Sequence, residues 1–156
     1  MHPSFLVASA LISLIVGKGH VPAGMIETSN PYVTRAEAVT ALLLARDAPL
    51  PVLQNRGQFA DVPHGAWFER TVLGAEKLSI LRADPVTHLL YPNRSLTRGE
   101  FLKMLTLTFG LPTGIKHTYT DIAKDSWVTP YAGLAQRYGL FTNANPKRLE
   151  PMRILN

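Results

Sequence analysis

A four-residue phrase that occurs twice constrains this chain more than any other feature. Residues 34–37 read Thr-Arg-Ala-Glu, and residues 97–100 read Thr-Arg-Gly-Glu. A threonine followed three residues later by a glutamate, just before an apolar run, is a capping box: the threonine hydroxyl and the glutamate carboxylate each accept from a backbone amide that the helix start leaves unpaired. Each copy therefore predicts the start of a helix. The structural caps that it predicts are Thr34, Glu37, Thr97 and Glu100.

The arginine inside each copy is not explained by capping. A cation in the first turn lies against the positive end of the helix dipole, which costs a few tenths of a kcal/mol up to about 1 kcal/mol. A residue that breaks a local rule at two equivalent places is a candidate for function. Guanidinium groups bind carboxylates bidentately, and free amides of the helix start would add donors. We therefore expect Arg35 and Arg98 to bind a carboxylate; the alternative is that each covers the preceding loop or pairs with a nearby acid.

A second phrase repeats in the later part of the chain. Phe-Ala-Asp-Val at 59–62 is followed by Trp67, and Tyr-Thr-Asp-Ile at 119–122 is followed by Trp127. Self-similarity at a fixed period predicts a repeat architecture whose units bury their apolar faces on one another. No segment alternates apolar and polar residues over strand length, so we predict a mostly α fold with long ordered loops. The helices expected after the second phrase are 72–81 and 132–141.

The length of 156 residues and the repeats together predict one domain. It divides into a partial first repeat at 1–50, a complete second repeat at 51–113 and a truncated third repeat at 114–156. The third is expected to be truncated because Asn156 falls on the cap position of a further helix. The apolar stretch at 4–16 is too short to cross a bilayer, and the sequence leaves open whether it is a buried core helix, a leader remnant or a membrane-facing segment.

Composition argues against several classes of function. The 16 Lys and Arg residues against 11 Asp and Glu give a net charge of +5, which suits an anionic partner. The basic residues are scattered and lack interleaved aromatic residues, so nucleic acid is not expected. Cysteine is absent, which excludes disulfides, thiolate metal sites and a cysteine nucleophile. The histidines lack metal-ligand spacing, and neither a phosphate loop nor a nucleophile elbow occurs, so we expect no enzyme, metal or cofactor.

The ordered combination of these motifs resembles the S-layer homology (SLH) domain family. Its members carry a Phe-x-Asp-[Val/Ile] opening, a later tryptophan, a helix, a loop and a Thr-Arg-Ala-Glu motif that opens a second helix. The resemblance covers about residues 30–156 and implies three units in a pseudo-threefold helical trefoil. It also implies non-catalytic anchoring to acidic cell-wall polysaccharide, often bearing a pyruvate ketal, in grooves between units. The location that it implies is extracellular, on the bacterial cell surface.

Two departures from the family pattern limit what this chain can build. The first repeat lacks the aromatic-x-Asp and Trp opening, and the third stops before its Thr-Arg-x-Glu helix, so at most two of the three grooves are expected. The glycan-binding residues that the resemblance implies are Arg35, Arg98, Trp67, Trp127, Asp61 and Asp121.

Each of these residue types also has a structural interpretation. The tryptophans would offer flat apolar faces to a sugar ring, although core packing is their commoner fate. The aspartates also fit turn or helix-cap acceptors, which bond amides about two residues further on. We expect Phe59 and Tyr119 to lie in the core.

The alternative function is an interaction module: an SLH fold without glycan binding that assembles with other surface-protein subunits or with itself. The truncated third repeat favours this interpretation, because a missing helix leaves an apolar gap. The segment 4–16, from the same chain or from another copy, is one candidate to fill it.

Overall fold

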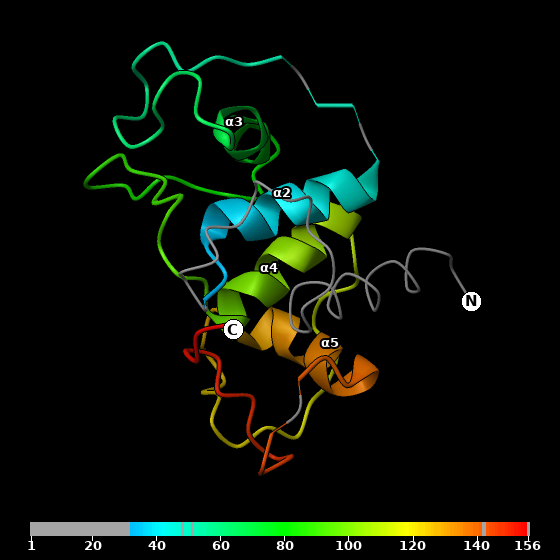
Figure 1. Ribbon diagram of the computed structural model, residues 1–156. Helices are drawn as coiled ribbons and strands as arrows, with labels where there is room; N and C mark the ends of the chain where they lie inside the picture. Colours follow the sequence, from blue (N-terminus) through cyan, green and yellow to red (C-terminus); the bar gives the residue numbers. More distant parts are fainter. Residues whose placement is uncertain (1–31, 48, 51, 142, 156) are drawn as a thin grey trace.

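A computed structural model (Figure 1) describes residues 32–47, 49–50, 52–141 and 143–155. It contains α2 (Arg35–Arg46), α3 (Glu69–Lys77), α4 (Arg98–Phe109) and α5 (Thr129–Tyr138). The described residues include no strand, only two isolated β-bridges, so the predicted mostly α fold is confirmed. None of the helices in this part of the chain is long and apolar enough to span a membrane. The segment 4–16, with the alternatives that the sequence leaves open for it, lies outside the described residues.

Both predicted capping boxes are confirmed. The Thr34 hydroxyl accepts from the Glu37 amide (3.2 Å), and the Glu37 carboxylate accepts from the Thr34 amide (2.8 Å). Thr97 and Glu100 make the same pair of bonds, at 3.4 and 3.1 Å. Because each box satisfies two backbone donors at a helix start, α2 and α4 begin where the sequence predicts.

The two shorter helices differ from the predicted ranges 72–81 and 132–141 at both ends. Each helix begins three residues earlier than predicted and ends before the last apolar residues of its predicted range. Ser79 and Gly139, just beyond α3 and α5, have φ of 58° and 60°, a left-handed conformation that ends a helix. Ile80 is buried although it lies outside α3. Apolar periodicity therefore continued past the point where the backbone stops being helical.

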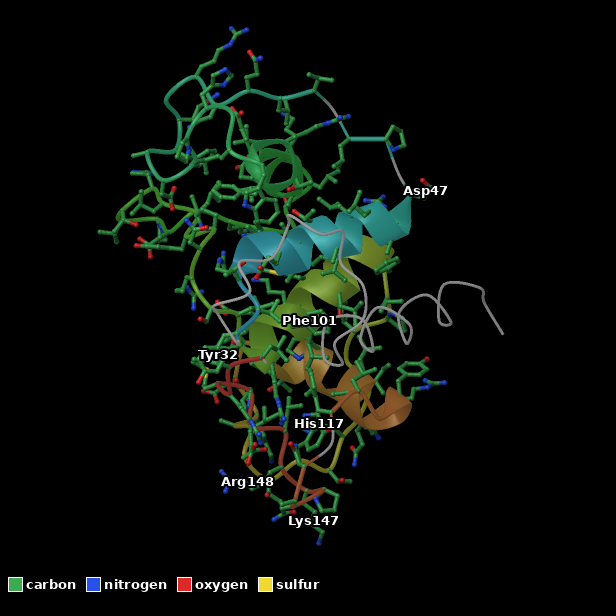
Figure 2. The ribbon with its side chains drawn as sticks, viewed as in Figure 1. Tyr32, Asp47, Phe101, His117, Lys147 and Arg148 are labelled. Atoms are coloured by element: carbon green, nitrogen blue, oxygen red, sulfur yellow. The ribbon has the colours of Figure 1, made fainter. Side chains whose placement is uncertain are left out.

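The helices lie in a stack in the order α3, α2, α4, α5 (Figure 1), in which α2 contacts α3 and α4, and α4 contacts α5. Phe101 of α4, near the middle of the stack in Figure 2, packs in a core cluster with α2 and α3. Leu102, the next residue, belongs to a second cluster with α5. Phe59 and Tyr119 are partly buried against the first and second cluster, so they lie at the edge of the core rather than inside it.

Three backbone hydrogen bonds close a ring between the repeats. The Val33 amide donates to the Leu155 carbonyl (3.0 Å), the Leu155 amide to the Leu96 carbonyl (2.9 Å), and the Leu96 amide to the Val33 carbonyl (2.8 Å). Val33 and Leu96 directly precede the caps of α2 and α4, and Leu155 aligns with them in the sequence. The ring thus joins three positions that the sequence predicts to be equivalent, while the pseudo-threefold arrangement of repeats stays a prediction.

Candidate functional site between the repeats

Two matching interfaces join the start of a long helix to a loop of the next repeat. At the first interface, the first two amides of α2 donate to carbonyls of the loop 90–96 (3.0 and 2.9 Å). At the second interface, the first two amides of α4 donate to carbonyls of the loop 149–155 (2.9 and 2.8 Å). The third amide of each helix is bound by its capping threonine. The expectation that free amides would serve a ligand here is therefore wrong, because these donors already have partners.

At the first interface, two arginines hold one carboxylate. Arg35, only 9% exposed, donates from Nε to the Leu90 carbonyl (3.1 Å) and from Nη1 to Glu100 Oε1 (3.1 Å). Arg94 donates to the same Glu100 oxygen. The other oxygen, Oε2, accepts from the Thr97 amide as part of the capping box (3.1 Å). We call Arg35, Arg94 and Glu100 the first clamp.

The second interface repeats the two arginines with a different carboxylate. Arg98, 7% exposed, donates from Nη1 to the Leu149 carbonyl (3.0 Å) and to Asn143 Oδ1. Its Nη1 lies 3.6 Å from Glu150 Oε2, and Arg153 Nη1 donates to that same oxygen at 3.0 Å. We call Arg98, Arg153 and Glu150 the second clamp. Of the two interpretations of the motif arginines, pairing with a nearby acid is confirmed for both; binding of an external carboxylate stays a prediction.

The two aspartates accept amides from the same loops. Asp61 accepts from the amides of residues 90 and 91 (3.2 and 2.6 Å), and Asp121 from those of residues 149 and 150 (2.9 and 2.7 Å). The prediction that they act as amide acceptors is confirmed, but the predicted local partners are wrong, since the amides lie 28 to 30 residues further along the chain. Arg148, at the lower end of the molecule in Figure 2, lies 3.8 Å from Asp121.

Trp67 and Trp127 are each 47% exposed, so the interpretation that they pack in the core is wrong. Lys103 Nζ lies 5.9 Å from the centre of the Trp127 ring system, within the range of a cation–π interaction. The tip of Trp127 also approaches α4 closely: a Cβ atom at Gly99 would lie 3.1 Å from Trp127 Cη2 and 3.2 Å from the Pro151 carbonyl. Gly99 follows Arg98, and Pro151 follows Glu150. The half-exposed indole therefore lies against the backbone next to two residues of the second clamp.

Burial and neighbouring charges both shift the pKa values of the charged groups at the interfaces. Burial lowers the pKa of Arg35 and Arg98, the neighbouring Arg94 and Arg153 lower them further, and Glu100 and Glu150 partly offset this by favouring the charged guanidinium. Burial alone would raise the pKa of Glu100 and of Asp121. Hydrogen bonds from Arg94 and the Thr97 amide outweigh it at Glu100, and the amides of the loop 149–155 outweigh it at Asp121, so both pKa values are lowered. Both carboxylates are thus held in the charged form.

Sequence reasoning missed four residues of the interfaces. Arg94 and Arg153 occupy equivalent positions of the repeat, four residues after Leu90 and Leu149, so an alignment of the two copies contained the signal that identifies them. Asn143 and Glu150 have no counterpart of the same type in the other copy. Their roles depend on the path of the loop, which no local pattern specifies.

No family model matches this sequence. The chain is similar to endo-1,4-beta-xylanase A of Thermoanaerobacterium saccharolyticum, with 35% identity over 89 residues. The match covers 55% of this chain and only 7% of that protein. This chain therefore corresponds to a small part of the relative's length.

Proposed function

We propose that this chain is a non-catalytic cell-surface module that binds an acidic cell-wall polysaccharide between its repeat units. The observation that carries the proposal is the half-exposed Trp127, whose ring tip lies against Gly99 at the start of α4 and whose ring has Lys103 over it. A flat apolar ring suits the face of a sugar, and guanidinium groups suit its carboxylate. Trp67 provides an equally exposed ring in the second repeat.

In this proposal the residues of the two interfaces have different tasks. Trp67 and Trp127 contact sugar rings, and Arg35 and Arg98 with their partner arginines provide positive charge. Asp61 and Asp121 position the loops that carry the partner arginines, because each holds two loop amides.

The comparison supports a non-catalytic role. The matched stretch is a minor part of a large enzyme, and a short segment of this kind suits attachment better than catalysis. Together with the resemblance to the SLH family, this supports a site of action outside the cell. The ligand proposed is a glycan that bears carboxylates, such as pyruvate ketals.

Co-sedimentation with purified bacterial sacculi tests the proposal. We expect Trp127→Ala to weaken binding about tenfold, which corresponds to about 1.4 kcal/mol, and the double variant with Trp67→Ala to lose it. Leu78→Ala is the matched control, because Leu78 is similarly exposed (44%) but lies at the C-terminal end of α3. Circular dichroism would verify that each variant is folded. Undiminished sedimentation of a folded double variant would refute glycan binding through these rings.

An assembly module is the second candidate, and one observation favours it. Leu44 of α2 and Leu107 of α4 occupy equivalent positions of the repeat, and they are 58% and 39% exposed. Exposed large apolar side chains at matching places on neighbouring helices suit a protein partner. Light scattering over a concentration series distinguishes self-association: a monomer at every concentration would exclude it.

A further inference from the structure

We propose that Glu150 is a built-in competitor at the second clamp, whose carboxylate occupies the place that a ligand carboxylate would take. It thereby sets how tightly Arg98 and Arg153 bind an external acid. The inference rests on the proposed function for the identity of the natural ligand, an acidic glycan. The exchange of one carboxylate for another at the clamp does not depend on that identity.

The two clamps have arginines at equivalent positions of the repeat, but their carboxylates come from different positions. Arg35 and Arg98 occupy the same position of the repeat, and so do Arg94 and Arg153. In the first clamp the carboxylate belongs to Glu100, on the neighbouring helix. In the second it belongs to Glu150, on the loop itself. A carboxylate between these two arginines is thus a recurring feature, and its source is variable.

The carboxylates of Glu100 and Glu150 differ in how many hydrogen-bond partners hold them. Both oxygens of Glu100 have partners: Oε1 accepts from two arginines, and Oε2 accepts from the Thr97 amide and hydroxyl (3.1 and 3.2 Å). In the described part of the chain, the Glu150 side chain is bound only through Oε2, by Arg153 at 3.0 Å and by Arg98 at 3.6 Å. The latter separation is beyond a hydrogen bond. Glu150 is therefore the carboxylate that can be displaced.

The second clamp is accessible from solvent. The side chains of Arg153 and Glu150 are 53% and 33% exposed, against 19% for Glu100. The tip of the half-exposed Trp127 lies near Gly99 and the Pro151 carbonyl, so a sugar on its ring would lie close to the loop that carries Arg153. The backbone of Glu150 stays fixed during such an exchange, because Asp121 holds its amide at 2.7 Å. Only the Glu150 side chain has to turn away, and the charge at the arginines is unchanged.

Titration of the full chain with sodium pyruvate, at constant ionic strength, tests this directly. Pyruvate is a simple carboxylate, and the Nε–Hε signals of the arginine side chains in NMR spectra report where it binds. We expect Glu150→Gln to bind pyruvate about tenfold more tightly than the wild type, a difference of about 1.4 kcal/mol. Adding Arg153→Gln should remove the gain, whereas adding Arg94→Gln should not.

Glu76→Gln, on α3, is the control for the change in net charge. Equal affinity of Glu150→Gln and wild type for pyruvate would overturn the inference, as would an equal gain in Glu76→Gln. Glu150→Ala is a second variant should the glutamine pair with the arginines by itself. Sacculus binding separates the two proposals. If the wild type binds sacculi but Glu150→Gln leaves the affinity for pyruvate unchanged, only the role of Glu150 as a competitor is refuted. A tenfold gain for pyruvate with no sacculus binding supports the competitor and refutes the glycan anchor.

Discussion

Asp61 and Asp121 each stabilise a loop residue in an unfavourable backbone conformation. Tyr91 and Glu150 have φ of 52° and 55°, a left-handed region that costs a non-glycine residue about 1–2 kcal/mol. The amide of each strained residue, and the amide before it, donates to the aspartate. Hydrogen bonds to charged groups contribute about 1.5–3 kcal/mol each, so two of them outweigh the strain. The same turn directs a loop carbonyl toward the buried arginine.

We expect Asp121→Asn to lower the free energy of unfolding by about 1–3 kcal/mol. An asparagine has one acceptor oxygen, so its NH₂ group would face the second amide donor. Urea unfolding measures the loss. Asp125→Asn is the control, because Asp125 is exposed in the same segment, and its change should stay within about 0.5 kcal/mol.

The effect of Asp121→Asn should depend on pH in a defined direction. The pKa of Asp121 is lowered in the folded protein, because the hydrogen bonds from loop amides outweigh the burial that would raise it. Its charge therefore contributes stability above the ordinary Asp pKa of about 3.9, and this contribution is lost as the pH falls through the folded pKa. The difference between wild type and variant should shrink below about pH 4. A difference as large at pH 3 as at pH 7 would contradict this role.

At the scale of helices and loops, the features predictable from sequence were those encoded within one helical turn. The starts of α2 and α4 follow from Thr34 and Thr97 with their glutamates, because a capping box is local. The ends of α3 and α5 were not predictable from apolar spacing, since Ile80 is buried in an irregular segment rather than a helix. A positive φ at Ser79, where the other copy has glycine, is equally hidden in the sequence.

Most residues of the candidate site were predictable from the sequence, but the contacts that they make were not. The motif arginines and aspartates lie at the two interfaces, and Trp127 lies against Gly99 at the second. Their partners are 28 to 65 residues distant in sequence, as for Asp121 with residue 149 and Arg35 with Glu100, so the fold has to form before the pairing is defined. The half-exposure of Trp127 depends likewise on how a loop and two helices meet.

Gly133 should be the most sensitive helical glycine of the described chain. A Cβ atom there would lie 2.0 Å from the Ile115 carbonyl oxygen, which is backbone and cannot turn aside. We expect Gly133→Ala to destabilise the protein by about 3 kcal/mol. At Gly74, the helical glycine of α3, an added Cβ atom would come only to 3.2 Å from the Leu50 side chain.

Because the Leu50 side chain can shift, the gain of up to about 1 kcal/mol in helix propensity should make Gly74→Ala close to neutral. Thermal unfolding of the two variants compares the same substitution on equivalent helices. Similar melting temperatures would show that the segment around Ile115 is free to move away from α5.

At the scale of the whole molecule, Glu100 joins parts of the chain that are remote in sequence. It caps α4 through Thr97, pairs with Arg35 of α2, and pairs with Arg94 of the loop between α3 and α4. Close by, the ring of backbone bonds links the segment before α2, the segment before α4 and the end of the described chain. Cohesion between repeats therefore depends on a small polar region as well as on the apolar clusters.

Glu37 offers a matched control for this role, since it makes the same capping box but has no ion pair in the described part of the chain. A glutamine can replace glutamate in a capping box, so Glu37→Gln should lose only the interaction of its charge with the helix dipole, about 0.3–1 kcal/mol. Glu100→Gln also leaves the buried guanidinium of Arg35 without its countercharge, and breaking such a pair costs about 3–5 kcal/mol. Because the Glu100 side chain is 19% exposed, we expect a loss near the lower of these two figures.

Urea unfolding of both variants at neutral pH measures the difference, and a double-mutant cycle with Arg35→Gln assigns it to the pair. Because the pKa of Glu100 is lowered by its hydrogen bonds from Arg94 and Thr97, which outweigh burial, the excess loss should disappear as acid protonates the wild-type carboxylate. Equal losses in the two glutamine variants would mean that Arg35 finds another partner. In that case the ion pair between Arg35 and Glu100 adds little to the cohesion between the repeats.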